Sequence, residues 1–291
     1  MSKNSLPVPL PRMSAATLLR ALFKRPAPSS ATMAAPTRYR LDRIDEASVA
    51  RYRAALGFQG SHIPLTWYYL PAQRAHLATM LAASFPFRVV GAIHVDNALE
   101  AGRTPLPGRP LELLTEVKVE PPAANGAVHA LLDTRATQDG ELVFACRSNY
   151  LVVRGARGHH RPAAAEMPAL APIAGWLLSA TSGREYASVS GDWNPIHLWR
   201  WTARLMGLKA PIIQGMHTLG RSCAELERAG GRRLRRLDGR FRAPVELGAR
   251  VGLAADLEGG RYTVESGGRL AVEGRFAFDS TQTILGAYPP S

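Results

Sequence analysis

The chain has 291 residues, of which 46% are hydrophobic and 20% are charged, and its formal net charge is +13. This composition supports a buried core and excludes a disordered or fibrous chain. No apolar run reaches the roughly 20 residues that span a bilayer, so we expect a soluble, cytoplasmic protein of about two domains. The basic charge favours an anionic partner. Without a zinc-finger, RRM or strong helix-turn-helix pattern, we do not expect it to be nucleic acid.

A basic arm is predicted over residues 1–38, either flexible or partly docked on the fold. No acidic residue occurs before Asp42, whereas Arg, Lys, Ser, Ala and Pro are frequent. Such a leader resembles an organelle transit peptide, which would place the protein in an organellar matrix. It equally fits a surface arm that touches anionic lipid, with a short amphipathic helical stretch at residues 15–24.

Residues 39–153 are predicted to form a first unit of helices followed by antiparallel strands. Asp45 is a suitable N-cap for a helix that ends at Leu56 before Gly57, and a second helix is expected over residues 72–82. Apolar, β-prone runs then predict strands at Val89–Val95, Leu111–Val119, Val128–Thr137 and Leu142–Val153. The turn Gln138-Asp139-Gly140 indicates a hairpin between the last two.

Residues 154–172 read as a linker because Gly, Pro, Ala and basic residues dominate. The adjacent His159 and His160 lack a third ligand nearby, so no metal site is predicted there. Residues 173–291 then repeat the plan of the first unit. Helices are expected at 185–189, 195–206 and 214–229, and strands at 234–242, 250–257, 261–264 and 270–278. The sequence therefore predicts an α+β fold of two tandem units.

One stretch carries candidate chemistry, Tyr186-Ala-Ser-Val-Ser-Gly-Asp-Trp-Asn-Pro-Ile-His197. Asn194 suits an N-cap and Pro195 the first helical position, with Gly207 as the stop. Asp192 lies just before this predicted helix and His197 on its first turn, so both side chains can share one water. A carboxylate paired with an imidazole suits general acid and base catalysis.

Together with Ala203, Gly207, Pro211-Ile212 and Gly215-Met216, this stretch resembles the signature of the MaoC-like, R-specific enoyl-CoA hydratase 2 family. The resemblance implies a tandem, or double, hot-dog fold, in which antiparallel sheets wrap around long central helices. The second unit would be the catalytic one. The first lacks the motif and would be a degenerate unit that completes a pseudo-dimer and shapes an acyl tunnel. A homodimer of such chains is an open possibility.

The resemblance also implies the roles of the site residues. Asp192 and His197 would activate the water that attacks C3 of a 2-enoyl thioester, with Asn194 supporting them. The backbone N–H of Gly215 would stabilise the thioester oxygen as negative charge develops. The product would be an (R)-3-hydroxyacyl thioester of fatty acid metabolism, and the reverse reaction is a dehydration.

The substrate would carry either coenzyme A or acyl carrier protein, and no cofactor or metal is expected. Two alternatives stay open from the sequence. One is a hot-dog acyl-thioesterase, and the other is an acyl-thioester-binding protein without catalysis.

Residues on the substrate side are harder to assign. The family usually has His where this chain has Gln214, which cannot titrate, and Gln214 and Met216 are predicted to contact substrate. Alternate residues of a strand share a face, so pairs of arginines two residues apart can line one site. We therefore predict a site for the phosphates of CoA there, and the alternative is a strand whose arginines are only solvated. The arginines of that candidate site are Arg233, Arg235, Arg240 and Arg242.

Four other ring side chains are assigned to packing. His62 and His217 are weak catalytic candidates, and a structural role is favoured for both. Trp199 and Trp201 follow the motif closely, and we expect them in the core, with a cover for an acyl or adenine surface as the alternative. Cys146 and Cys223 are expected to be buried and unpaired, as in a reducing compartment.

Overall fold

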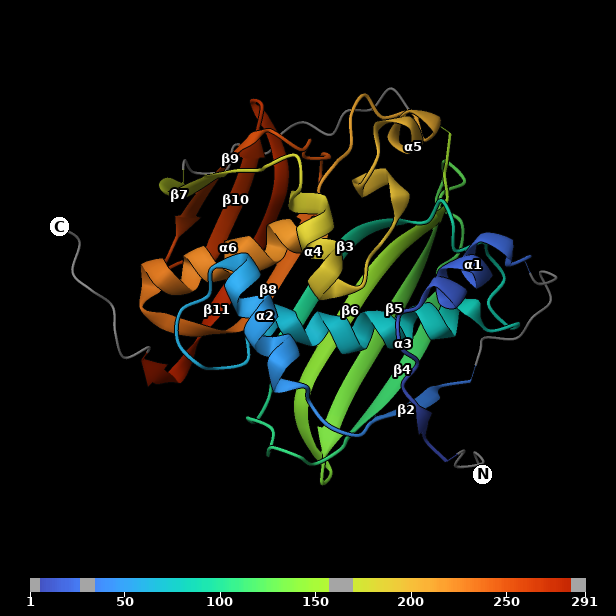
Figure 1. The fold of residues 1–291 in the computed structure, drawn as a ribbon, viewed down its shortest axis with the longest axis horizontal. Coiled ribbons are helices and arrows are strands. Elements are labelled where there is room, and N and C mark those ends of the chain that lie inside the picture. The colour runs from blue at the N-terminus through green and yellow to red at the C-terminus, as the bar shows by residue number, and fades with distance from the viewer. Residues whose placement is uncertain (1–5, 27–34, 157–169, 284–291) are drawn as a thin grey trace. The chain divides into compact units, whose positions relative to one another are not determined.

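The computed structural model describes residues 6–26, 35–156 and 170–283, which group into two compact units (Figure 1). Unit 1 takes Met1–Ile44 and Tyr69–Ala169, and unit 2 takes Asp45–Tyr68 and Leu170–Ser291. The sequence-based division placed residues 45–68 in the first unit. In the structure they belong to unit 2, because helix α2 (Glu46–Leu56) packs on α4 (Ser182–Ser190) and α6 (Gly215–Gly230).

The sheet of unit 1 has the strand order β1-β2-β4-β5-β6-β3, antiparallel except that β1 runs parallel to β2. The predicted hairpin is confirmed, since Asp139 and Gly140 adopt φ values of 53° and 84°, as a two-residue turn between twisted strands requires. The strands are β1 (Val8–Pro9), β2 (Thr37–Leu41), β3 (Ile93–Ala101), β4 (Leu111–Val119), β5 (Val128–Gln138) and β6 (Glu141–Val153).

The strand predicted at Val89–Val95 was wrong, because β3 begins only at Ile93 and continues to Ala101. Its second half holds polar residues that an apolar-run criterion rejects. Asn97 is nevertheless buried, since its amide donates to Arg147 O and Ser148 Oγ on the neighbouring strand β6. Hydrogen bonding across the sheet thus offsets the cost of burying the amide nitrogen, while the amide oxygen of Asn97 has no partner among the described residues.

Helix α3 (Tyr69–Leu81) lies across the strands of unit 1 and packs on β2, β4 and β5 (Figure 1). It begins earlier than predicted, and Pro71 is tolerated in its first turn, where no backbone donor is needed. The core beneath it includes Met80, Phe85, Val117 and Leu132. Fully burying each such side chain contributes roughly 1.5–3 kcal/mol.

His76 on α3 is fully buried, and neither of its ring nitrogens has a hydrogen-bond partner among the described residues. Burial, together with nearby His94, lowers the pKa of His76 to about 3. The ring is therefore neutral in the native state over most of the acid range. An unpaired buried polar group costs about 1–3 kcal/mol, so His76 is a weak point of unit 1.

We expect His76→Leu to be at least as stable as the wild type at pH 7 and more clearly so at pH 5. Below pH 6.5 or so the unfolded chain protonates this histidine, whereas the native state does not until about pH 3. The native state then binds fewer protons, so stability falls as pH falls, by about 1.4 kcal/mol per pH unit. Urea unfolding at both pH values measures this. The difference in free energy of unfolding between His76→Leu and the wild type should be about 2 kcal/mol larger at pH 5 than at pH 7. An unchanged difference would contradict the assignment.

The described part of the N-terminal arm contacts unit 1. Strand β1 pairs with β2, and the Arg74 guanidinium donates to the carbonyls of Leu10 and Pro11. Helix α1 (Ala15–Phe23) starts at the N-cap Ser14, whose hydroxyl accepts the N–H of Thr17. The arm is thus held to the rest of unit 1 on the N-terminal side of α1, through β1 and the carbonyls of Leu10 and Pro11.

The sheet of unit 2 is antiparallel, with the order β8-β11-β10-β9-β7. Its strands are β7 (Ala171–Leu177), β8 (Arg232–Phe241), β9 (Arg250–Asp256), β10 (Arg261–Ser266) and β11 (Arg269–Thr283). Strand β7 begins inside the predicted linker and was missed. Its small, mixed residues give no alternating pattern, and pairing with β9 makes it a strand.

Helix α6 lies across the strands of unit 2 in Figure 1 and packs on β7 and β8. Helix α2 approaches it closely because Gly220 has no side chain: a Cβ there would lie 2.6 Å from Leu56 Cδ1. The predicted cap and stop of α2 are confirmed, since Asp45 Oδ1 accepts the N–H of Ala47 and Gly57 has a φ of 74°. The 3-10 helix η1 (Leu65–Tyr68) also packs on α6.

The continuous helix predicted over residues 195–206 was wrong. The chain forms a 3-10 helix, η2 (Pro195–His197), and then a separate helix, α5 (Arg200–Leu205). Trp199 between them is extended, with φ −133° and ψ 140°. The Thr202 hydroxyl donates to both Pro195 O and Trp199 O, which satisfies carbonyls at this break.

Candidate active site

A chain of local hydrogen bonds shapes the loop that carries Asp192. Helix α4 ends at Gly191, whose φ of 76° turns the chain away from the helix axis. The Ser190 hydroxyl accepts the N–H of Asp192, and Asp192 Oδ1 accepts the N–H of Asn194 at 3.2 Å. Asn194 Oδ1 then accepts the N–H of Ile196, which starts η2. The predicted N-cap is therefore confirmed, since Asn194 caps η2.

His197 is buried at the end of η2, and its ring is fixed by one contact. Its Nδ1 lies 2.8 Å from the carbonyl oxygen of Ile212. A carbonyl only accepts, so Nδ1 carries the proton and Nε2 of the neutral ring carries a lone pair. This lone pair faces the carboxylate of Asp192.

Nε2 of His197 lies 3.9 Å from Oδ2 of Asp192. This distance is too long for a direct hydrogen bond, and both atoms are acceptors when the imidazole is neutral and the carboxylate ionised. A water molecule can donate one hydrogen to each of them. The sequence placed the two side chains near each other, and the structure brings them within reach of one water.

Gln214, the N-cap of α6, is only 2% exposed and ties the site together. Its Nε2 donates to Gly183 O at 3.1 Å and to Asp192 O at 3.2 Å. Gly183 itself must be small, because a Cβ there would lie 2.2 Å from His197 O. The amide of Gln214 thus links α4, the Asp192 loop and the start of α6.

We expect Gln214→Leu to lower the turnover rate about tenfold or more, because two buried carbonyls lose their donor and the Asp192 loop shifts. Gln138→Leu in unit 1 is a matched control. Gln138 is as buried, and its amide bonds the backbone of Leu106 and Arg109. Both variants should lower the thermal midpoint, and only Gln214→Leu should lower kcat with a small change in KM. If Gln214→Leu and Gln138→Leu have the same kcat, Gln214 does not position the Asp192 loop for catalysis.

Gly215 is the first residue of α6, where backbone N–H groups have no partner within the helix. A glycine at this position leaves the backbone open to close approach by a substrate. The structure gives another reason: the space of a Cβ is taken by the Phe241 ring, with its Cε1 2.8 Å away. Met216, the next residue, is buried.

The four arginines proposed as a phosphate site differ in exposure and in their contacts. The register of β8 shifts so that Leu234 pairs with Phe278 and Arg236 with Ala277, which leaves Arg235 as an extra residue. Simple alternation of faces therefore fails along β8. Arg235 and Arg240 are exposed, Arg233 is half-buried, and Arg242 forms an ion pair with Glu273.

The structure places the remaining candidates in packing or structural roles. His217 is buried edge-on to the Tyr186 ring, and burial lowers its pKa to about 4, so it is neutral near pH 7. His62 is paired with buried Glu227, a contact that sequence reasoning missed. Cys146 and Cys223 are free and buried, as expected.

The expectation of core packing for Trp199 and Trp201 was wrong, since both are exposed, Trp201 by 64%. Trp199 lies at the break before α5, and the buried residues of α5 are Thr202 and Ala203, not Trp201.

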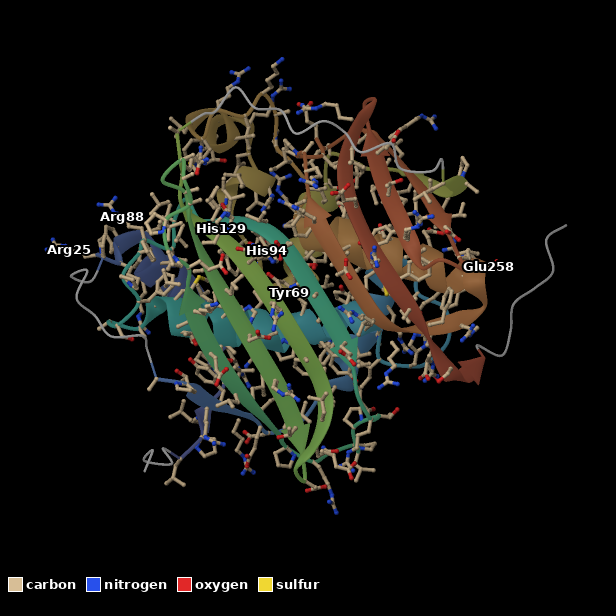
Figure 2. The ribbon with its side chains drawn as sticks, turned by 180° about the vertical axis from the view of Figure 1, so that it is seen from behind. Arg25, Tyr69, Arg88, His94, His129 and Glu258 are labelled. Atoms are coloured by element: carbon tan, nitrogen blue, oxygen red, sulfur yellow. The ribbon has the colours of Figure 1, made fainter. Side chains whose placement is uncertain are left out.

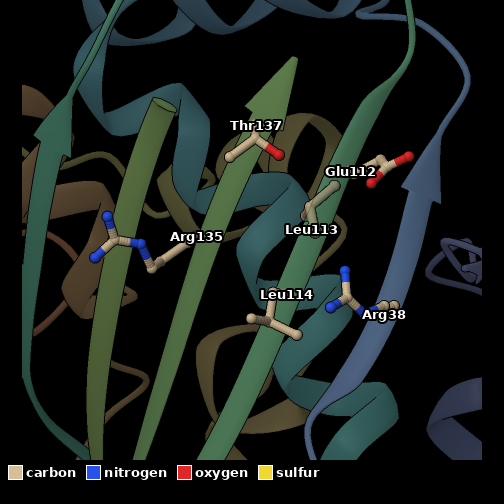
Figure 3. Close-up of a pocket in the computed structure, with 6 residues that line it drawn as sticks. All are labelled: Arg38, Glu112, Leu113, Leu114, Arg135 and Thr137. Atoms are coloured by element: carbon tan, nitrogen blue, oxygen red, sulfur yellow. The ribbon is translucent and has the colours of Figure 1, made fainter. Parts of the chain in front are cut away.

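A shallow hollow of about 200 Å³ is found on the sheet of unit 1, lined by Arg38, Glu112, Leu113, Leu114, Arg135 and Thr137 (Figure 3). It contains none of the predicted site residues. Among the described residues no cluster of three or more His, Cys, Asp or Glu side chains could hold a metal. His159 and His160 lie outside the described residues. No described helix has the length and apolar character needed to cross a membrane.

The chain is similar in sequence to known proteins. A model of the MaoC like domain matches residues 172–271. The chain is 30% identical over 227 residues to 3-hydroxyacyl-thioester dehydratase X of Mycobacterium tuberculosis, covering 75% of this chain and 79% of that protein.

Solved structures add the fold. The crystal structure of HtdX from M. tuberculosis matches with a TM-score of 0.66 and 26% identity, over 82% of this chain and 98% of that one. Rv0216 from the same organism, described as a double hot-dog, matches with a TM-score of 0.54 and 17% identity, over 84% and 96%. The fold is therefore the expected double hot-dog, and the chain belongs to the family of MaoC-like dehydratases.

Proposed function

We propose that this chain adds water to 2-enoyl thioesters to give (R)-3-hydroxyacyl thioesters, and catalyses the reverse dehydration. One observation carries the proposal: Nε2 of His197, at the end of η2, and Oδ2 of Asp192, in the loop before it, are two acceptors 3.9 Å apart. A water that donates to both has its own lone pair free for attack. Similarity to a 3-hydroxyacyl-thioester dehydratase supports the class of substrate.

In the hydration direction, the bound water attacks C3 while one of its protons passes to Nε2 of His197. The π electrons move toward the thioester and give an enolate-like oxygen. A proton from the Asp192–His197 pair is then delivered to C2 as the enolate collapses. Hydroxyl at C3 and hydrogen at C2 are thus added from the same face, and no cofactor is needed.

The developing oxygen charge needs a donor. The free N–H groups at the start of α6, that of Gly215 first, combine a hydrogen bond with the positive end of the helix dipole. Loss of one such donor typically costs on the order of 100-fold in rate. The exposed Arg235 and Arg240 are the remaining candidates for a CoA phosphate, while an acyl carrier protein would present its own acidic surface.

The test follows the enoyl-thioester absorbance of crotonyl-CoA and of a medium-chain 2-enoyl-CoA, with chiral analysis of the product. Loss of absorbance with an (R)-3-hydroxyacyl product supports the proposal and ranks the acyl lengths. An (S) product would refute the stereochemical assignment. Release of free thiol without hydration would instead make the chain an acyl-thioesterase. Binding without either reaction would make it a binding protein.

A further inference from the structure

Helix α1 carries three large apolar side chains on its outer face. Leu19, Leu22 and Phe23 are 55%, 61% and 75% exposed, and at their spacing they share one side of the helix. Ala21, which points the other way, is buried. One exposed leucine on a surface needs no explanation, but three neighbouring large side chains on one helical face do.

The contacts that hold α1 to unit 1 leave this face open. The ammonium group of Lys24, directly after the helix, donates to Phe85 O at 2.6 Å. Before the helix, the Arg74 guanidinium holds Leu10 O and Pro11 O. The helix is thus fastened by polar contacts at its two ends, and its apolar stripe is not used for packing.

Exposed cations border the stripe. Arg20 lies on the helix and Arg25 just after it, and Arg88 follows the segment that Lys24 binds. Figure 2 shows Arg25 and Arg88 at the edge of unit 1 where α1 runs. Within the described residues none of these three arginines has an ion-pair partner, and residues 6–26 contain no Asp or Glu. We call the six residues Leu19, Leu22, Phe23, Arg20, Arg25 and Arg88 the arm patch.

We propose that the arm patch binds the surface of an anionic phospholipid bilayer. A short helix with apolar side chains on one face and cations at its rim is suited to the boundary between headgroups and acyl chains. A second copy of this chain fits less well, because an isologous contact through the patch would set arginine against arginine. Such binding would hold the enzyme at the membrane without a spanning helix, independently of the proposed reaction.

The test is co-sedimentation of the purified full chain with vesicles of phosphatidylcholine alone and of phosphatidylcholine with phosphatidylglycerol. We expect binding to the anionic vesicles that weakens as salt is added. Leu19→Ser/Leu22→Ser/Phe23→Ser should abolish it. Arg20→Gln/Arg25→Gln/Arg88→Gln should weaken it on the order of 100-fold, at about 5-fold per cation. Unchanged circular dichroism and an unchanged thermal midpoint would show that both variants stay folded.

Two matched variants locate the effect. Arg38→Gln/Arg135→Gln removes two exposed arginines from the sheet of the same unit, and Trp201→Ser/Leu205→Ser removes two exposed apolar residues of α5. Both should bind vesicles nearly as the wild type does. The proposal fails if the wild type ignores anionic vesicles, if the arm variants bind as well as it does, or if only the α5 variant loses binding. It also fails if the patch proves to hold two copies together in analytical ultracentrifugation.

Discussion

Asp192→Asn and His197→Gln should each lower hydration of a 2-enoyl-CoA by about 10²–10⁴-fold, the range typical of a lost general acid or base. Asparagine presents an amide where the carboxylate accepts from water, and it cannot take up a proton. Glutamine at position 197 can still donate toward Ile212 O, which His197 now contacts, yet it supplies no titrating nitrogen. Initial rates on crotonyl-CoA, with kcat and KM separated, measure both effects.

A matched substitution separates chemistry from folding. Asp256→Asn makes the same change in unit 2 at a half-buried carboxylate that pairs with Arg261 and is none of the predicted site residues, so it should leave kcat within about twofold. The double variant Asp192→Asn/His197→Gln should be little slower than either single variant, because two groups that share one water act as a unit. If the loss of activity in the double variant equals the two single losses combined, or if either single variant is fully active, the shared-water mechanism is wrong.

The local geometry of this site was predictable because it rests on short-range rules. Asn194 as a cap and Pro195 after it both follow from backbone preferences within a few residues. The nearness of Asp192 and His197 follows from them. The hairpin at Asp139-Gly140 was predictable for the same reason.

Contacts between residues far apart in sequence were not predictable. Nothing near Gln214 reveals that its amide donates to Gly183 O, 31 residues away. The break at Trp199 is local but was also missed, because the Thr202 hydroxyl satisfies the carbonyls of Pro195 and Trp199, whereas helix periodicity alone favours a continuous helix. Likewise, sequence order alone assigns α2 to the first unit. Only the structure shows that Leu56 of α2 packs against Gly220 of α6, where there is no side chain in the way.

The buried pair of His62 and Glu227 is such a contact, and it predicts a large loss of stability. Both side chains are nearly inaccessible, at 6% and 4% exposed, and Nε2 of His62 lies 2.9 Å from Oε2 of Glu227. Glu227 Oε1 accepts the N–H of Leu234, so removing the imidazole leaves one carboxylate oxygen buried without its partner. We expect His62→Ala to lower the free energy of unfolding by about 3–5 kcal/mol, measured by urea denaturation.

Two further variants identify the cause. Arg242→Ala breaks a more exposed ion pair with Glu273 in the same unit and should cost at most about 1 kcal/mol. His62→Leu/Glu227→Gln removes the buried charge while the new amide oxygen can still accept from Leu234, so it should recover much of the loss. If the double variant is as unstable as His62→Ala, packing around the ring, and not the uncompensated carboxylate, is what His62 supplies. If the double variant instead regains stability, the uncompensated carboxylate is the cause of the loss. Residues 45–68, which contain His62, would then stabilise unit 2 through this pair with Glu227 of α6.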